Sequence, residues 1–418
     1  MNDWIKYILR NNLYTNHYQK IIDKIYKKSN DEIINLYNIK FKEIINHAYS
    51  HSKFYNSYYK KNGVDVNEIK SINDIDKLPI ITSKIIKNEI NKIYCGNSIF
   101  KIEGLTSGTT GSPLTTFRTI KSINIENAFL RNYRENLGFQ KKERIVYIRG
   151  YLNKNSLYHY DKESNKLFIS SPNINNKTIN LFYHLIKEFK PKAIEAFPSY
   201  LYKLFVELRN KDLKLIIPTA FTSSEMLYEY QRENIEQYFN TRIYDWYGNV
   251  ERTICLAQDH KKRYKPLPLY SINEYKNNNI ITTALHNYSF PLIRYAVDDT
   301  IIVKSTDFEK NLIEPDIIKI EGRTGNTLQL KDGSIVGCID HAFKGIKHLN
   351  KAEIIQSKKD CSIKLKLAVS NNYNKNDELL LMGNLNNMLG KDIDIELEYA
   401  TELEDLESNK KFQLIKHI

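Results

Sequence analysis

Hydrophobic residues recur at helical spacing in several parts of the chain. Between residues 31 and 48, Tyr37, Phe41, Ile44 and Ala48 follow Ile34, with Lys and Asn between them. This spacing predicts an amphipathic helix whose aromatic side chains face the core. A second helix should follow the apolar "LPI" at 78–80, with Thr82 or Ser83 as its N-cap, and a third should occupy residues near 120–137.

Short apolar runs follow several of the helical segments. "RIVYIRG" at 144–150 is typical of a buried strand. The helical pattern at 179–190 leads into "PKAIEAF" at 191–197, and the one at 227–239 leads into "TRIYDWYG" at 241–248. A repeated order of helix and apolar strand predicts α/β layers around a substantially parallel sheet.

The hydrophobic pattern changes after Gly322. "CSIKLKLAV" at 361–369 predicts a strand, and alternating apolar and acidic residues at 393–398 predict another. One face of a helix between these strands is marked by Leu381, Leu385, Met388 and Leu389. We therefore expect a large domain over 1–322 and a small α+β domain over 323–418, with the boundary near Arg323 to Asn326.

Composition indicates a globular protein with a basic surface. The chain has 418 residues, of which 41% are hydrophobic, which suffices for a core. Its 62 Lys and Arg exceed its 49 Asp and Glu, giving a net charge of +13. Because the lysines are spread along the whole chain, a solvated surface is favoured over a specific nucleic-acid site.

Cysteine usage and hydropathy indicate the cellular setting. Cys95, Cys255, Cys338 and Cys361 lie far apart without a CxxC pair, so neither a disulfide framework nor a zinc site is expected. The ten histidines show no paired metal-binding spacing. No segment reaches the roughly 20 apolar residues of a spanning helix. A cytoplasmic protein without a membrane span is the expectation.

One stretch contrasts with the rest of this Lys- and Asn-rich chain. In "EGLTSGTTGSPLTTF", the eight residues from Thr106 to Pro113 are small or turn-forming and uncharged. Such a loop lets backbone N–H groups and hydroxyls approach a bound phosphate. Taken in isolation, the stretch favours a surface turn over a phosphate loop, and it lacks the GxxxxGK[ST] spacing of a Walker loop.

Further motifs follow this loop in a fixed order: "DWYGNVER", "FPLIRYAVDD", "EGRTGNTL" and "NKKFQLI". With "TSGTTGSPL", they resemble the adenylate-forming superfamily, and within it the phenylacetate-coenzyme A ligase family with its CapK-type members. The resemblance implies an α/β fold with a large N-terminal domain of layered sheets and helices. It also implies a small, mobile α+β C-terminal domain that carries the adenylation lysine.

The resemblance implies roles for individual residues at an ATP site. The phosphate loop would hold the β- and γ-phosphates, although Ser112 stands where the family often has Lys. Glu251 would bind Mg²⁺, with a surface ion pair to Arg252 or a neighbour as the alternative. Asp299 would accept from the ribose hydroxyls, although Asp298 replaces the usual Gly beside it and a solvated turn is the alternative. The loop and adenine-side residues are Thr106, Ser107, Gly108, Thr109, Thr110, Gly111, Tyr247 and Gly248.

The remaining implied roles concern the domain junction and the acid. Arg323 would approach the ribose or phosphate, Asn326 would replace the hinge Asp, and Lys411 would reach the substrate carboxylate and α-phosphate. A plain linker arginine and a solvated lysine are the alternatives for Arg323 and Lys411. The acid pocket would include Ser223, Ser224 and Glu225, whereas the nearby Phe197 and Tyr200 are equally typical of core.

The implied reaction is ATP-dependent adenylation of a carboxylic acid, followed by transfer to a thiol, with coenzyme A as the family's usual acceptor. A second reading is amide or ester formation in surface-polysaccharide assembly, with a uronic-acid-containing sugar or an amine and without coenzyme A. A third is a degenerate nucleotide- or nucleic-acid-binding protein. This interpretation is suggested by Ser112, Asp298 and Asn326, which differ from the residues that the family usually has at these positions. The acid, the acceptor and the oligomeric state stay open.

Overall fold

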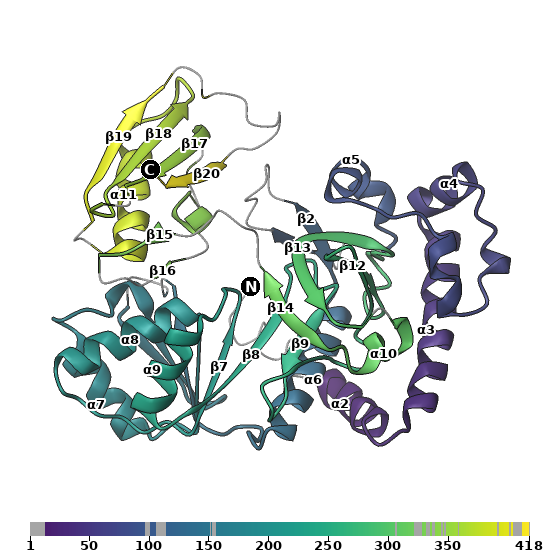
Figure 1. The fold of residues 1–418 in the computed structure, drawn as a ribbon, viewed down its shortest axis with the longest axis horizontal. Coiled ribbons are helices and arrows are strands. Elements are labelled where there is room, and N and C mark those ends of the chain that lie inside the picture. Colours follow the sequence, from purple (N-terminus) through teal and green to yellow (C-terminus); the bar gives the residue numbers. More distant parts are fainter. Residues whose placement is uncertain are drawn as a thin grey trace. The chain divides into compact units, whose positions relative to one another are not determined.

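The computed structural model describes residues 13–96, 101–105, 114–150, 152, 156–305, 307–321, 328–331, 335–336, 339–343, 346, 348–357, 359–390, 393–400, 403 and 412–417. The chain divides into two compact units. Their helices and strands are labelled in Figure 1. Unit one comprises Met1–Thr106, Leu114–Lys141 and Tyr244–Gly322. Unit two comprises Ser107–Pro113, Lys142–Ile243 and Arg323–Ile418.

Helices of unit one follow the predicted apolar spacing. The helix expected at 31–48 is α3 (Asn30–His51), which begins at a capping box between Ser29 and Glu32. Thr82, rather than Ser83, caps α5 (Ser83–Ile93) by accepting from the Ile85 amide. The other helical segments are α2 (Leu13–Ile25), α4 (Lys53–Lys61), η1 (Val66–Glu68), η2 (Ile72–Lys77), α6 (Ile120–Asn136) and α10 (Phe308–Ile313).

Strands of unit one are antiparallel. The small-residue stretch is flanked by the paired strands β1 (Ile102–Leu105) and β2 (Thr115–Arg118). A four-stranded sheet has the order β11 (Ser271–Lys276), β12 (Asn279–Ala284), β13 (Tyr295–Val303) and β14 (Ile317–Glu321). β8 (Arg242–Gly248), whose last five residues belong to unit one, pairs with β9 (Cys255–Gln258), which pairs with β10 (Tyr264–Pro266).

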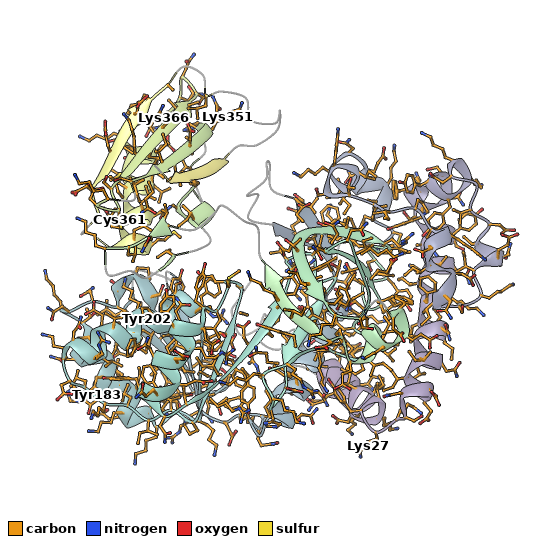
Figure 2. The ribbon with its side chains drawn as sticks, in the orientation of Figure 1. Lys27, Tyr183, Tyr202, Lys351, Cys361 and Lys366 are labelled. Atoms are coloured by element: carbon orange, nitrogen blue, oxygen red, sulfur yellow. The ribbon has the colours of Figure 1, made fainter. Side chains whose placement is uncertain are left out.

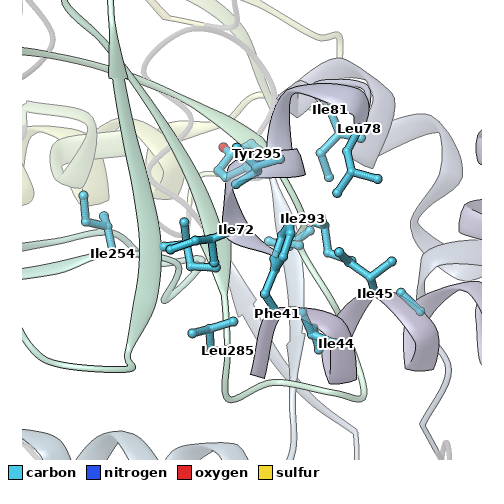
Figure 3. Close-up of a cluster of buried hydrophobic side chains, with 14 of the residues drawn as sticks. Phe41, Ile44, Ile45, Ile72, Leu78, Ile81, Ile254, Leu285, Ile293 and Tyr295 are labelled. Atoms are coloured by element: carbon cyan, nitrogen blue, oxygen red, sulfur yellow. The ribbon is translucent and has the colours of Figure 1, made fainter. Parts of the chain in front are cut away.

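The core of unit one joins α3 to the four-stranded sheet. Phe41 and Ile44 of α3 are fully buried in one cluster with Ile72, Ile293 and Tyr295 (Figure 3). Burying such side chains contributes about 1.5–3 kcal/mol each. The cluster therefore fixes the beginning of β13, where Tyr295 lies.

The first part of unit two contains the predicted parallel sheet. β5 (Lys166–Ser170), β3 (Ile145–Arg149), β6 (Ala193–Ala196) and β7 (Thr219–Ser223) are parallel neighbours in this order, and β4 (Tyr158–Asp161) pairs antiparallel with β5. Apolar residues of the sheet pack with those of the helices, as expected for helix-covered parallel strands. The helical segments are η5 (Ser171–Asn173), α7 (Ile179–Phe189), α8 (Pro198–Asn210) and α9 (Glu229–Phe239).

The C-terminal part of unit two has its own hydrophobic core. Its four-stranded sheet has the order β19 (Ile395–Tyr399), β18 (Ile363–Val369), β17 (Leu349–Gln356) and β20 (Phe412–His417), with an antiparallel central pair. Buried leucines of α11 (Lys375–Leu389) join this core. The remaining elements are β15 (Leu328–Gln329), β16 (Ile335–Val336) and η6 (Ile339–Phe343). The predicted strand–helix–strand pattern is confirmed, and the domain limits 1–322 and 323–418 stay a prediction.

Charged side chains lie on adjacent strands of the same C-terminal sheet. Figure 2 shows Lys351 and Lys366 on adjacent strands. Lys364 and Lys366 of β18 approach Glu398 of β19 at 2.8 and 3.8 Å. Lys364 and Lys366 therefore form ion pairs with the neighbouring strand β19, which agrees with the prediction of solvated surface charge.

Among the described residues, no helix is long and apolar enough to cross a membrane. Cys95, Cys255 and Cys361 are free thiols.

Candidate nucleotide site

Two hydrogen bonds in unit one join residues of the predicted ATP motifs. The Tyr247 hydroxyl at the end of β8 donates to Asp299 Oδ2 at 2.7 Å. The Tyr295 hydroxyl donates to Glu251 Oε1 at 2.8 Å. These partners are 52 and 44 positions apart in the chain. The fold thus brings the "DWYGNVER" and "FPLIRYAVDD" motifs together.

A short turn presents Glu251 between β8 and β9. The Asn249 side chain closes this turn, because its Nδ2 donates to Thr253 Oγ1 at 2.7 Å and its Oδ1 accepts from the Thr253 amide at 2.8 Å. The Arg252 amide donates to the Asn249 carbonyl at 3.1 Å. Asn is well suited to such side-chain closure of a turn.

Gly248 precedes this turn at a point of close packing. A Cβ at this position would lie 2.8 Å from Cζ3 of Trp246 and 3.2 Å from the Ile254 carbonyl oxygen. Any larger residue would displace the indole ring or the backbone. The glycine of the motif is therefore needed for packing within the structure.

Glu251 occupies a buried position rather than a surface one. Only 8% of the residue is exposed, so the alternative of a surface ion pair is wrong. Arg252 instead forms an ion pair with Glu126 of α6. A buried carboxylate oriented by a tyrosine hydroxyl fits a hard cation such as Mg²⁺, whose other ligands are commonly phosphate oxygens and water.

Asp298 and Asp299 lie within strand β13, so the alternative of a turn before the strand is wrong. The register with β12 shifts here, because Ile280 pairs with Val297 whereas Asn279 pairs with Thr300. Asp298 is exposed, whereas Asp299 is half-buried and accepts from Tyr247. Of the two acids, Asp299 is therefore the one tied to the motif residues.

Charged residues of β2 and α6 lie beside the turn that carries Glu251. The Arg118 side chain donates through Nη2 to the Val250 carbonyl. Burial lowers the pKa of Arg118 to about 10, and the nearby charge of Arg252 acts in the same direction. Burial raises the pKa of Glu126, while Arg252 and Arg118 oppose this rise. The turn carrying Glu251 is thus set in a charged, largely desolvated environment.

The predicted acid-pocket residues belong to unit two. Ser223 ends β7 and its Oγ lies 3.4 Å from that of Ser224, whose backbone is left-handed with φ of 73°. Glu225 accepts from the Ser199 amide at 3.1 Å in the first turn of α8. A carboxylate at a helix N-terminus stabilises that helix. Glu225 therefore has a structural role, and the acid pocket stays a prediction.

The half-buried rings of Phe197 and Tyr200 stack at 5.1 Å next to this segment. Tyr200 packs against the core of unit two. Figure 2 marks Tyr202 on the same helix, and its ring makes an edge contact with that of Tyr230 at 5.4 Å. Tyr200 thus adjoins that core, and a role of these rings in the acid pocket stays a prediction.

Several predicted site residues lie outside the described residues, and their roles stay predictions. They are Thr106, Ser107, Gly108, Thr109, Thr110, Gly111, Ser112, Arg323, Asn326 and Lys411. Within the part of the chain that the structure describes, no group of three or more His, Cys, Asp or Glu could hold a metal ion. A metal that binds mainly through ATP phosphates does not require such a group.

Sequence reasoning missed the residues that support the motif acids. Tyr295 belongs to the "PLIRY" element quoted above, which was the signal that could have identified it. Arg118 and Glu126 carry no local signal, because their contacts with the turn are made across 132 and 126 positions of sequence. Only the tertiary structure reveals them.

Known proteins are similar to this chain in sequence over most of its length. Residues 328–417 match the family model of the CapK C-terminal domain. The chain is 23% identical to Protein CapK of Staphylococcus aureus, over 97% of this chain and 93% of that protein. It is 22% identical to phenylacetate-coenzyme A ligase of Escherichia coli (strain K12), over 72% of this chain and 79% of that protein.

Solved structures show the same fold. The complex of 2-hydroxyisobutyryl-CoA ligase with 2-HIB-AMP and CoA in the thioesterification state has a TM-score of 0.64 and 15% identity, covering 93% of this chain and 90% of that one. An open conformation of that ligase gives a TM-score of 0.57 at 15% identity, with 91% of both chains covered. The predicted resemblance and α/β fold are confirmed: residues 328–417 match the CapK C-terminal domain, and the chain has the fold of 2-hydroxyisobutyryl-CoA ligase.

Proposed function

We propose that this protein is an adenylate-forming ligase that activates a carboxylic acid with ATP. A carboxylate oxygen attacks the α-phosphorus, the bond from that phosphorus to the β-bridging oxygen breaks, and pyrophosphate leaves. The acid is then held as acyl-AMP, which has a good leaving group. The observation that carries this proposal is the pair of hydrogen bonds from Tyr247 to Asp299 and from Tyr295 to Glu251.

Each motif residue has a task in binding and orienting ATP. Asp299 would accept hydrogen bonds from the ribose hydroxyls, and Tyr247 would orient that carboxylate. Glu251 would hold Mg²⁺, oriented by Tyr295, and the bound metal would neutralise charge on the phosphates. The loop from Thr106 to Gly111, Arg323 and Lys411 would contribute donors to the phosphates and the carboxylate.

Transfer of the acyl group is the second half of the proposed reaction. The sulfur of coenzyme A would attack the acyl carbonyl, the bond to AMP would break, and the thiol proton would pass to solvent. Turning of the small domain about Asn326 would separate the two steps. The fold shared with 2-hydroxyisobutyryl-CoA ligase supports this acceptor.

A second acceptor class is favoured by the similarity to CapK over 97% of the chain. The acyl group would then pass to an amine or a sugar in surface-polysaccharide assembly, and the acid would be a uronic-acid-containing sugar. Nucleic acid is not a proposed partner, because Glu251 and Asp299 stand at the motif positions expected for ATP chemistry and are joined by hydrogen bonds to Tyr295 and Tyr247. The cytoplasm, which supplies ATP and a reducing environment, is the proposed location.

The test is acid-dependent release of AMP and pyrophosphate by purified protein with Mg-ATP. Hydroxylamine traps acyl-AMP as a hydroxamate, so a panel of aryl acids, short acids, amino acids and uronic acids would identify the acid class. Stimulation by coenzyme A would support thioester formation, whereas stimulation by amines or sugars alone would support the second acceptor class. Release of ADP and phosphate instead would contradict adenylation.

A further inference from the structure

Helix α6 carries a buried carboxylate that the proposed reaction does not yet use. Glu126 is only 8% exposed. Its Oε2 forms an ion pair with Nη1 of Arg252, and its Oε1 accepts from the Tyr270 hydroxyl at 3.3 Å. Because a buried charge is costly unless it is paired, Glu126 and Arg252 depend on each other.

Arg252 directly follows the candidate metal ligand Glu251 and has an unusual backbone. Its φ of 58° lies in the left-handed region, which non-glycine residues rarely adopt. The amide of Arg252 also closes the turn onto the Asn249 carbonyl at 3.1 Å. An unfavourable backbone conformation persists only where surrounding contacts hold it. The ion pair with Glu126 is such a contact.

The other neighbour of Glu251 is also held from outside the turn. Arg118 of β2 donates to the carbonyl of Val250. Its guanidinium lies across Gly104 of β1, where a Cβ would overlap it. Both residues that flank Glu251 are therefore fixed by side chains of other elements, and Tyr295 fixes the carboxylate itself.

We propose that Glu126 is a positioning residue, which holds Arg252 and thereby aims Glu251 at the metal of Mg-ATP. This inference rests on the proposed function. A merely structural ion pair would contribute to stability and would leave the magnesium requirement unchanged. A positioning role makes a different prediction, because outer contacts that orient a metal ligand commonly change metal affinity by about 10- to 100-fold.

The test compares the wild-type protein with the double variant Glu126→Met/Arg252→Met. Replacing both members of a buried ion pair by apolar residues avoids an unpaired charge, so we expect this variant to fold. Arg252→Gly is a second variant, because glycine tolerates the left-handed φ while the ion pair is lost. Arg232→Met, which removes a buried arginine from α9 of unit two, is the matched control.

Two readouts separate positioning from stability. Calorimetry would measure binding of α,β-methylene-ATP at increasing Mg²⁺ concentrations, and AMP release would be measured over the same range. We expect the Mg²⁺ concentration at half-saturation to rise about tenfold or more in both Glu126/Arg252 variants, and to stay unchanged in Arg232→Met. An unchanged magnesium requirement in either folded variant would overturn the positioning role. A wild-type protein that binds no Mg-analogue would instead overturn the proposed function.

Discussion

At the scale of single residues, the hydroxyl of Tyr295 is the group that orients Glu251. Tyr295→Phe removes the 2.8 Å hydrogen bond and leaves the buried ring in place. A hydrogen bond to a charged group contributes roughly 1.5–3 kcal/mol, so AMP release at limiting Mg²⁺ should fall about tenfold or more. Tyr275→Phe, another tyrosine change in unit one, is the control. Equal activity of Tyr295→Phe and wild type would contradict this role for Tyr295.

The neighbouring acids Asp298 and Asp299 provide a matched pair of substitutions. Asp299 accepts from Tyr247, whereas Asp298 is exposed. Asp299→Asn weakens acceptance from the ribose hydroxyls, so KM for ATP should rise about tenfold, while Asp298→Asn should change it little. Steady-state kinetics at varied ATP would measure both. A larger effect of Asp298→Asn would contradict the assignment of the ribose contact to Asp299.

At the scale of secondary-structure elements, Arg294 ties the segment around η2 to the four-stranded sheet. This left-handed residue is 4% exposed and donates to Glu274 at 2.9 and 2.7 Å, to Asp76 at 2.8 Å, and to the Leu78 carbonyl. The contacts hold the start of β13, where Tyr295 lies. Arg294, the arginine of the "PLIRY" element, thus stabilises the backbone that carries Tyr295.

Breaking this buried pair should therefore destabilise the protein. Arg294→Met removes the guanidinium from the buried Glu274 and leaves Lys276, whose Nζ lies 3.2 Å from Glu274 Oε2, as the remaining paired cation. The loss of the buried contacts of Arg294 should lower the free energy of unfolding by roughly 3 kcal/mol. Urea titration followed by circular dichroism would measure the change. Arg263→Met is the control, because Arg263 is half-exposed in its ion pairs with Asp259 and Glu314 and should change stability by roughly 1 kcal/mol or less. Similar losses in the two variants would contradict the role of the buried contacts.

Local patterns predicted elements more successfully than they predicted contacts. The helix at 31–48 was evident because Tyr37, Phe41 and Ile44 repeat on one face, and these residues are buried. β13 includes Asp298 and Asp299, whose interruption of the apolar run was the basis for the alternative of a solvated turn. The hydrogen bond from Tyr295 to Glu251 joins positions 44 residues apart, so the periodicity of apolar residues cannot predict it. The motif resemblance gave Glu251 a role but did not identify Tyr295 as its partner.

At the scale of the whole molecule, His286 makes folding sensitive to acid. It is 6% exposed, and burial lowers its pKa to about 4, with the charge of Arg252 acting in the same direction. An unfolded histidine gains a proton near pH 6.5, whereas the folded one does not until about pH 4. Protonation between these values favours unfolding, so stability is lost as the pH falls from about 6.5 to 4.

His286→Gln should remove this component of the acid sensitivity. The single group accounts for roughly 3 kcal/mol of stability over that pH range. Urea titrations at pH 7, 5.5 and 4.5 would show a shallower decline in the variant, whereas the exposed His159→Gln should retain the wild-type slope. An identical slope in His286→Gln and wild type would show that other groups cause the acid sensitivity.

The central claim for the whole protein is that it forms an acyl-adenylate reversibly. Exchange of labelled pyrophosphate into ATP, measured with the acid identified by hydroxamate trapping and without any acceptor, tests it most directly. We predict acid-dependent exchange that requires Mg²⁺ and is lost in Lys411→Ala and in Glu251→Gln. Acid-independent ATP cleavage, or acid-dependent turnover without pyrophosphate exchange, would contradict the account.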